Sequence, residues 1–240
     1  MNTDGLIIRE KSTGEQNRLV TVLTRDYGVI RACVYGAKKI GSRTGAATQL
    51  FAFSEFGIAE RRGSYIIEAA KPKEVFFNLR NDVKKIALAQ YFAELSESLV
   101  PEGENAEEYL KLILNSLMLL MNEKRDEKLI KAVFELSIIS MAGYMPGIVA
   151  CEKCGKYEDE FMTFDISSGN IYCSNCPEYG IKVPMSVISA IRHVVLSDRQ
   201  KIFNFNLNES SLQALSDVSE RYVLSTLQRR FKTLDFYHMI

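Results

Sequence analysis

Short apolar runs rich in β-branched and aromatic residues fill the first 75 positions of the chain. Clusters of turn-forming residues at 12–14, 26–28 and 61–64 separate them. This pattern predicts five strands, at residues 6–11, 19–24, 29–36, 50–60 and 65–71. The second and third strands are close enough to form one hairpin, and the fourth and fifth another. Five short strands predict a small barrel of the OB-fold type, although an SH3-like barrel fits the pattern nearly as well.

Around residues 73–81 the pattern changes, and apolar residues then recur at three- and four-residue spacing. This is the period of an amphipathic helix. It predicts helices over about 83–95, 110–121, 126–143, 185–196 and 208–222. We therefore predict an α+β protein, with an OB-fold barrel domain at residues 1–78 and a helical-bundle domain at 79–240.

Four of the five cysteines form two C-x2-C pairs, Cys151 with Cys154 and Cys173 with Cys176. Two such pairs complete a tetrahedron around one ion and leave no position open for water. The intervening residues alternate like two strands joined at 167–169, which predicts a zinc ribbon or hairpin inserted between helices at about 148–180. We predict one structural Zn²⁺; four unrelated reduced thiols and an iron–sulfur cluster are the alternatives. The fifth cysteine, Cys33, is predicted to be a small buried core residue.

Basic and acidic residues number thirty each, so the net charge of the chain predicts no partner. Their distribution is more informative, because residues 1–80 carry 13 Lys and Arg against 8 Asp and Glu. This imbalance favours a local polyanion-binding surface, although chance clustering in solvated loops would produce it too. The sequence shows no secretory signal and no apolar stretch approaching the roughly 20 residues of a membrane span. We therefore expect a cytoplasmic protein with no membrane partner.

The search for catalytic residues yields little. The two histidines, His193 and His238, form no H-E-x-x-H pattern. Residues 36–43 half resemble a P-loop, but Ser42 stands where that motif requires lysine. The acidic run 158–160 would suit a magnesium-dependent nuclease, although such a run is usually a solvated face. We therefore predict that the protein binds its partner and is not an enzyme.

The basic residues of the predicted barrel are the strongest candidates for a binding site. Side chains alternate along a strand, so Arg31, Cys33 and Tyr35 should share one face. Lys and Arg neutralise phosphates, and an exposed aromatic ring stacks on an unpaired base. The candidate DNA-binding residues are Arg18, Arg31, Tyr35, Lys38, Lys39, Arg43, Arg61 and Arg62. The alternative is that Tyr35 lies in the core and that the basic hairpin tips serve solubility.

Several segments, in this order, resemble the RecO family of bacterial recombination and repair mediators. They are residues 5–9, Glu15 with 18–28, 34–39 with Arg43, and Leu136 with 143–146 running into 151–155. The helical residues after 182 carry the resemblance least. Some members of that family lack the cysteines, so zinc is not required for the family's activity.

The resemblance implies an OB-fold that binds single- and double-stranded DNA and promotes annealing of complementary strands. It also implies joint action with RecR and single-strand-binding protein in loading a RecA-type recombinase, with RecF as a further candidate partner and a nucleoid-associated location. DNA contact would fall on the basic residues named above, foremost on Lys38, Lys39 and Arg43. A second hypothesis is a zinc-stabilised protein–protein adaptor whose barrel binds a partner in place of nucleic acid.

Overall fold

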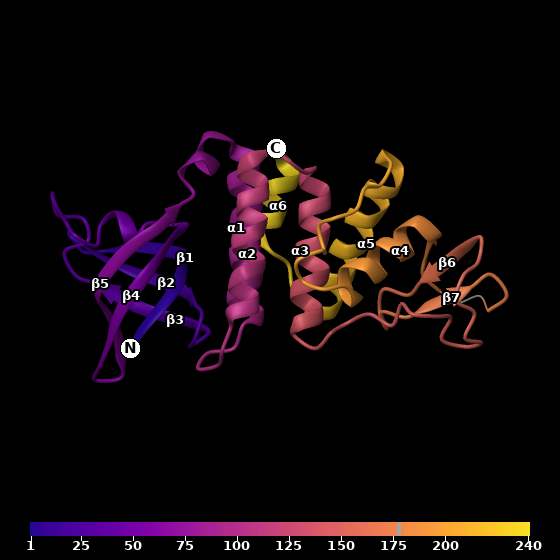
Figure 1. The fold of residues 1–240 in the computed structure, drawn as a ribbon, viewed down its shortest axis with the longest axis horizontal. Helices are drawn as coiled ribbons and strands as arrows, with labels where there is room; N and C mark the ends of the chain where they lie inside the picture. The colour runs from indigo at the N-terminus through magenta and orange to yellow at the C-terminus, as the bar shows by residue number, and fades with distance from the viewer. Residues whose placement is uncertain (177–178) are drawn as a thin grey trace. The chain divides into compact units, whose positions relative to one another are not determined.

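The computed structural model describes residues 1–176 and 179–240 (Figure 1). The chain packs as two compact units. The barrel unit contains residues 1–122 and 231–240, and the cysteine unit contains residues 123–230. The predicted division into residues 1–78 and 79–240 stays a prediction. Among the described residues, no helix is both long and apolar enough to cross a membrane.

The barrel unit begins with five strands. They are β1 (Asn2–Thr13), β2 (Asn17–Thr24), β3 (Val29–Val34), β4 (Ala52–Arg61) and β5 (Ser64–Val75). They close into a barrel in the order β1-β2-β3-β5-β4, in which only the β3–β5 pair is parallel. The predicted five-stranded OB-fold and both of its hairpins are confirmed. Inward side chains such as Val22, Ile30 and Phe56 form the barrel core.

Strand β3 shows how alternation orients the candidate residues. Ile30, Ala32 and Val34 are buried in the barrel, whereas Arg31 is exposed and Tyr35 is 64% exposed. The prediction that Cys33 is a buried core residue is wrong, because Cys33 is only partly buried. Cys33 lies two residues from both Arg31 and Tyr35, and alternation along the strand therefore places it with them on the outward face.

Three helices complete the barrel unit: α1 (Val83–Leu99), α2 (Glu107–Asn122) and α6 (Lys232–Met239). Asp82 caps α1, because its carboxylate accepts hydrogen bonds from the backbone N–H groups of Lys84 and Lys85. The sequence did not predict α6, which has only eight residues. Tertiary contacts hold it: the ring of Phe231, just before it, packs edge-on against Tyr91 of α1.

The β2–β3 turn joins the barrel to the first two helices. The N–H of Gly103 donates to the Tyr27 carbonyl at 3.0 Å, and the N–H of Ala106 donates to the Arg25 carbonyl at 2.8 Å. Gly28 lies between them with φ +65°, and a Cβ atom there would lie 1.8 Å from the Pro101 carbonyl oxygen. Only glycine permits this approach, so the barrel and the α1–α2 connection pack as one body.

The cysteine unit combines three helices with a small sheet. Its elements are α3 (Glu127–Met141), β6 (Phe161–Phe164), β7 (Ile171–Cys173), β8 (Ile181–Pro184), α4 (Met185–Leu196) and α5 (Glu209–Leu227). The strands pair in the order β7-β6-β8. The two strands expected between the cysteine pairs are present as β6 and β7, whereas β8 was not predicted.

A charged network is buried between α3 and α5. Lys131, whose side chain is 1% exposed, lies 3.0 Å from a carboxylate oxygen of Glu135 and 2.8 Å from one of Glu220. The Ser219 hydroxyl donates to Glu135 at 2.6 Å. Burial raises the pKa of the Glu135 carboxyl, and the Lys131 ammonium opposes that rise. The network therefore fixes the facing positions of two helices at the cost of desolvating their charges.

Candidate nucleic-acid interface and metal centre

The basic loop, residues 36–45, follows β3 and consists of successive tight turns. The N–H of Lys39 donates to the Gly36 carbonyl at 3.1 Å, and the N–H of Ser42 donates to the Lys39 carbonyl at 3.0 Å. A third bond, from Gly45 to Ser42, is 3.4 Å long. Each of these bonds spans four residues, as in a β-turn, so the loop backbone is ordered.

Both ends of the basic loop are tied to the start of β2. At the start, the Gly36 N–H donates to the Asn17 side chain at 2.9 Å, and Ala37 is buried in the barrel core. At the end, the Arg18 guanidinium donates to the Gly45 carbonyl at 2.7 Å. The loop is therefore held at its base and projects from it.

The three basic side chains of this loop differ from Arg18 in what they contact. Lys38, Lys39 and Arg43 are exposed, and no described residue forms an ion pair or a hydrogen bond with any of their side chains. The Arg18 side chain is only 14% exposed and lies 3.9 Å from a Glu10 carboxylate oxygen. Arg18 thus contacts the loop itself, whereas the other three cations face solvent.

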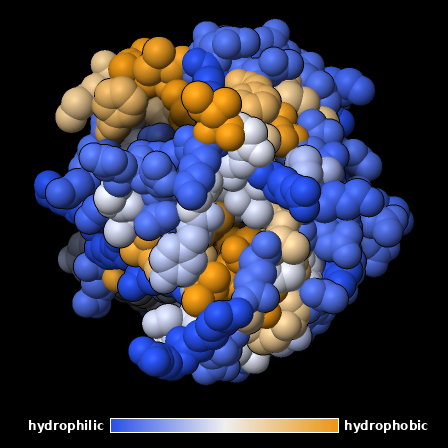
Figure 2. All heavy atoms as spheres, turned by 90° about the vertical axis from the view of Figure 1, so that its left-hand side faces the viewer, coloured by the Kyte–Doolittle hydropathy of each residue, from blue (hydrophilic) through white to orange (hydrophobic). Residues whose placement is uncertain are grey.

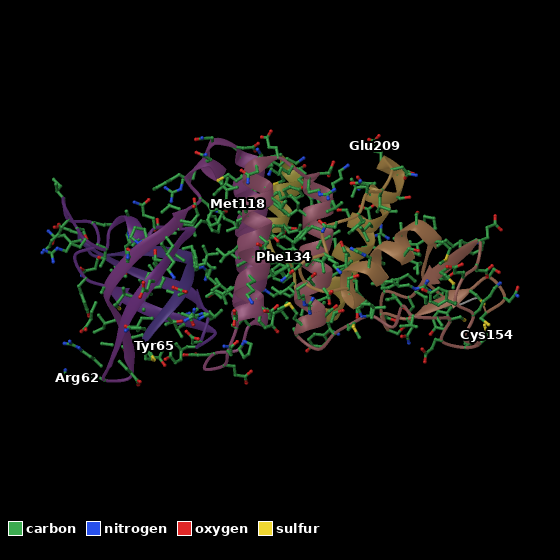
Figure 3. All side chains as sticks on the ribbon, in the orientation of Figure 1. Arg62, Tyr65, Met118, Phe134, Cys154 and Glu209 are labelled. Carbon is green, nitrogen blue, oxygen red and sulfur yellow. The ribbon has the colours of Figure 1, made fainter. Side chains whose placement is uncertain are left out.

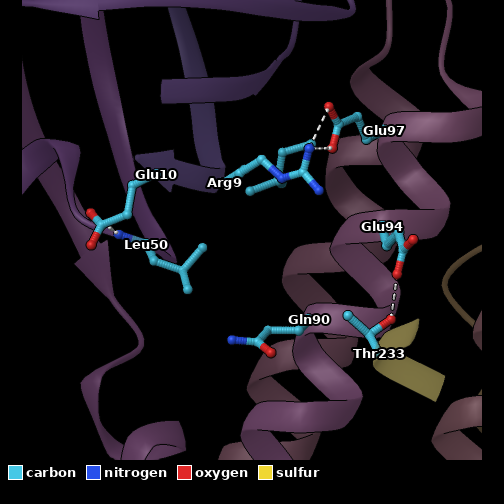
Figure 4. A pocket seen from close by; sticks show the side chains of 8 residues that line it. Arg9, Glu10, Leu50, Gln90, Glu94, Glu97 and Thr233 are labelled. Carbon is cyan, nitrogen blue, oxygen red and sulfur yellow. Dashed lines mark hydrogen bonds and ion pairs between the residues drawn. The ribbon is translucent and has the colours of Figure 1, made fainter. Parts of the chain in front are cut away.

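Arg31 is paired with a carboxylate on α1. Its guanidinium lies 3.2 Å from Glu97, which also binds Arg9 of β1 at 3.3 Å. Arg9 and Glu97 line a pocket of about 250 Å³ between β1 and α1 (Figure 4). Glu10 and Glu94 add two more carboxylates to that pocket, so it repels phosphate.

Arg62 lies at the tip of the β4–β5 hairpin (Figure 3), and Arg61 is the last residue of β4. Arg61 forms an ion pair with Glu68. Arg62 and Gly63 both have positive φ, which fits a two-residue type I′ turn. Because β3 and β5 are parallel and Ala32 pairs with Tyr65, this tip aligns with the start of β3. The basic loop follows the end of β3, so these two predicted contacts lie at opposite ends of that strand.

The four paired cysteines come together in the cysteine unit. Their sulfur atoms all lie within 4.8 Å of one another, and the Cys154 and Cys173 sulfurs are 3.5 Å apart. Tetrahedral coordination at about 2.3 Å from metal to sulfur places sulfurs about 3.8 Å apart. The geometry therefore fits one metal ion with a complete set of thiolate ligands.

The backbone around the cysteines is braced from several directions. The N–H of Gly155 donates to the Cys151 carbonyl at 2.8 Å, and the N–H of Cys176 donates to the Cys173 carbonyl at 3.0 Å. Asp159 joins the two turns, because it accepts bonds from the Ser174 hydroxyl at 2.7 Å and from the Lys156 ammonium at 3.1 Å. These contacts hold the two cysteine pairs in place relative to each other.

Arg192 of α4 is a further brace that sequence reasoning did not single out. Its guanidinium donates to the carbonyls of Ile148, Val149 and Tyr157 at 2.7–2.9 Å and lies 4.0 Å from the Tyr157 ring centroid. These carbonyls flank the first cysteine pair on both sides. No sequence signal pointed to Arg192, because it lies far along the chain in an otherwise apolar helix.

The charges at this centre favour a cation. Burial raises the pKa of the Cys151 thiol, but hydrogen bonds from backbone N–H groups outweigh burial and lower it to about 6. The hydrogen bond between Cys176 and the Cys154 sulfur raises the pKa of the Cys176 thiol to about 12. Sulfurs this close share protons in the absence of a cation, and a bound divalent ion replaces those protons.

The acidic run at residues 158–160 does not form an open carboxylate site. Hydrogen bonds from Ser174, foremost from its hydroxyl, hold the pKa of Asp159 well below its usual range. Asp159 is occupied by Ser174 and Lys156, so it braces the cysteines. Within residues 1–176 and 179–240, the only group of three or more potential ligands close enough to hold a metal is the four-cysteine cluster.

Known families match the chain over nearly its whole length. The family model described as Recombination protein O N terminal matches residues 1–76, and the one described as Recombination protein O C terminal matches residues 80–235. The DNA repair protein RecO of Acetivibrio thermocellus is 31% identical over 239 residues, which cover 98% of this chain and 95% of that protein.

Two further relatives carry the same description. The DNA repair protein RecO of Alkaliphilus metalliredigens is 28% identical, with 98% of this chain and 97% of the relative covered. The DNA repair protein RecO of Caldicellulosiruptor bescii is 29% identical, with 100% of this chain and 98% of the relative covered. The barrel, the helical segments and these matches together show that the chain belongs to the RecO family of DNA repair proteins.

Proposed function

We propose that this protein is a non-enzymatic recombination and repair mediator that binds single- and double-stranded DNA and promotes annealing of complementary strands. The observation that carries the proposal is the basic loop, which is braced at its base and directs three unpaired cations into solvent beside the exposed Tyr35. In this proposal it acts with RecR and single-strand-binding protein to load a RecA-type recombinase, with RecF as a further candidate.

Annealing requires no bond chemistry from the protein. Two complementary strands repel each other through their phosphates, and a basic surface that lowers this repulsion while leaving base edges free lets them pair. Such a surface releases condensed counterions on binding, so its action weakens as salt rises. The exposed cations of the basic loop supply this surface.

The predicted DNA-binding residues take different roles in this proposal. Lys38, Lys39 and Arg43 neutralise phosphates, and Tyr35 stacks on an unpaired base. Arg18 is a positioning residue that holds the loop through the Gly45 carbonyl. The remaining three residues contribute outside the basic loop. Arg31 does so although it is paired with Glu97, which also binds Arg9. Arg61 and Arg62 lie at the opposite end of β3 from the loop.

We further propose that the metal of the cysteine cluster is one Zn²⁺ with a structural role. Four thiolates with no open coordination position match a closed structural zinc site. Lys156 lies next to the cluster and offsets part of the −2 charge that four thiolates leave on Zn²⁺. The site has no vacant ligand position for a substrate, so its contribution is to folding.

Reversing the charge of the basic loop tests the DNA-binding proposal. The triple variant Lys38→Glu, Lys39→Glu, Arg43→Glu should bind a labelled single strand of DNA at least about tenfold more weakly. The slope of the logarithm of the binding constant against the logarithm of the salt concentration should fall in magnitude by about 2. Annealing of two labelled complementary strands, followed by energy transfer, should slow in parallel. The circular dichroism spectrum should not change, because these exposed side chains form no ion pair or hydrogen bond that the variant would break.

The matched control is the variant Lys124→Glu, Arg199→Glu, Arg230→Glu, which changes the same charge at exposed residues of the cysteine unit. It should lose much less affinity than the loop variant. Equal losses in both would show that binding depends on overall charge and not on the loop. If the wild-type protein neither binds nor anneals DNA at low salt, the adaptor hypothesis replaces this proposal.

Replacing Arg18 with glutamine should separate positioning from phosphate contact. Without the Arg18 hydrogen bond to Gly45, backbone amides of the basic loop should exchange with deuterium faster. Arg43→Gln should weaken DNA binding and leave amide exchange in the loop unchanged. Hydrogen exchange followed by mass spectrometry makes the comparison, and unchanged exchange in Arg18→Gln would contradict the positioning role.

A further inference from the structure

Ile40 lies at the centre of the basic loop and is fully exposed, at 106% of the reference accessible area for isoleucine. It is the second residue of the turn closed by the hydrogen bond from the Ser42 N–H to the Lys39 carbonyl. Gly41, with φ +76°, takes the third position, where a type II turn requires a positive φ. A side chain at the second position stands on the corner of the turn and points away from the loop.

Isoleucine is a poor choice for that corner on local grounds. Proline and small polar residues favour tight turns, whereas β-branched residues favour strands. An exposed apolar side chain also gains nothing in the folded protein while it faces water. Single exposed apolar residues are common on proteins, so what distinguishes Ile40 is how the loop holds it and which residues surround it.

The loop cannot fold back to bury Ile40. Its two ends are fixed by the Asn17 and Arg18 hydrogen bonds, and Ala37 already occupies the adjacent place in the barrel core. Three successive turns then hold the intervening backbone. The isoleucine is thus presented on an ordered support, so an incoming ligand meets it with little loss of chain entropy.

The surroundings of Ile40 identify the ligand. Lys38, Lys39 and Arg43 flank it, and the sequence has no Asp or Glu between Asp26 and Glu55. An apolar tip among cations matches a base step, where apolar ring faces are stacked between phosphates. Viewed from the barrel end, apolar residues stand in separate groups on a mainly hydrophilic surface (Figure 2). One isoleucine is too small to anchor a protein partner or a lipid surface alone.

We propose that Ile40 is a wedge that inserts between successive bases of bound single-stranded DNA and unstacks them. This inference rests on the proposed DNA-binding function and adds to it a mechanism. Lys38, Lys39 and Arg43 hold the phosphates on both sides of the step, while Ile40 replaces one base–base contact with a base–isoleucine contact. Unstacked bases present their pairing edges to a complementary strand, which favours annealing.

The test uses single strands that contain the fluorescent base 2-aminopurine, whose emission rises when it is unstacked. The full-length wild-type protein at saturation should raise this emission, and Ile40→Leu should do the same. Ile40→Ala should lose most of the rise, while its affinity falls by no more than about tenfold, because the cations remain. Val83→Ala, at an exposed β-branched residue of α1, is the matched control and should behave as the wild type.

The outcomes distinguish the wedge from the function on which it rests. If Ile40→Ala binds DNA and gives the wild-type emission at saturation, the wedge is wrong and the DNA-binding proposal stands. If the wild type fails to bind DNA at low salt in the preceding titration, both are wrong. If Ile40→Ala keeps the emission change but loses binding to phosphatidylglycerol vesicles, the tip contacts lipid and the wedge is again wrong.

Discussion

Replacing Cys173 with serine is expected to abolish metal binding and to lower the stability of the cysteine unit by several kcal/mol. Cys173 is buried at the end of β7, and its sulfur is one of four that converge on a single point. Metal affinity in a closed thiolate site is folding free energy, on the order of 10–16 kcal/mol in isolated zinc fingers. The surrounding helices and sheet retain part of that stability here, so the loss should be smaller than in a free finger.

Metal content by mass spectrometry and thermal unfolding measure the two effects together. Cys33→Ser is the matched control, because Cys33 lies on the outer face of the barrel, outside the cluster. It should keep one Zn²⁺ per chain and the wild-type unfolding temperature. The DNA affinity of the Cys173→Ser protein that remains folded should also be preserved. A Cys173→Ser variant without metal that unfolds at the wild-type temperature would contradict the structural role.

Replacing Lys131 with methionine should destabilise the cysteine unit by about 3–5 kcal/mol, because it removes the ammonium that neutralises the buried Glu135 carboxylate. Glu135 is fully buried, and the Lys131 ammonium lies 3.0 Å from its carboxylate. The double variant Lys131→Met, Glu135→Leu removes the buried charge pair and should recover much of the loss. Urea unfolding followed by circular dichroism measures each free energy.

Glu127 provides a control for the Lys131 and Glu135 variants, because its replacement also removes a charge from α3. It lies at the start of α3, where Glu127→Leu removes a carboxylate that is only partly buried. Its effect should stay within about 1 kcal/mol, because a carboxylate in the first turn of a helix and near the surface contributes no more than this. If Lys131→Met costs no more than this control, the network does not hold α3 against α5. If the double variant is as unstable as Lys131→Met, lost packing and not unpaired charge explains the effect.

Local sequence patterns predicted most elements because their signals lie within a few residues. Alternation in β3 placed Arg31 and Tyr35 on the same face, and three- and four-residue spacing placed the helices close to their observed ends. The cysteine pairs could be predicted because two thiolates that bind one ion from the same chain turn are separated by two residues, a spacing that is visible in the sequence. The prediction that Cys33 is buried failed because residue type was given more weight than alternation along the strand.

Features that depend on tertiary contact escaped prediction. Helix α6 is too short to show a period, and β8 exists because β6 offers it an edge. Arg192 donates to carbonyls beside Cys151 from helix α4, which lies about forty residues further along the chain. No spacing motif in the sequence therefore predicts this contact. For the same reason, Arg18 and Arg43 look alike in sequence, although one contacts the loop backbone and the other contacts only solvent.

The pairing of Arg9 and Arg31 with Glu97 changes how the salt dependence of DNA binding is to be read. A free lysine that meets a phosphate releases one condensed counterion from the DNA, and each such contact steepens the dependence. An arginine that moves from Glu97 to a phosphate also releases a condensed counterion from the DNA, but its ion pair with Glu97 must break first. When Arg31 leaves, Arg9 stays beside Glu97, so the carboxylate keeps a cation and no ion uptake cancels the release. In the proposed complex, Arg31 should therefore add to the salt slope as a loop cation does, yet contribute less affinity.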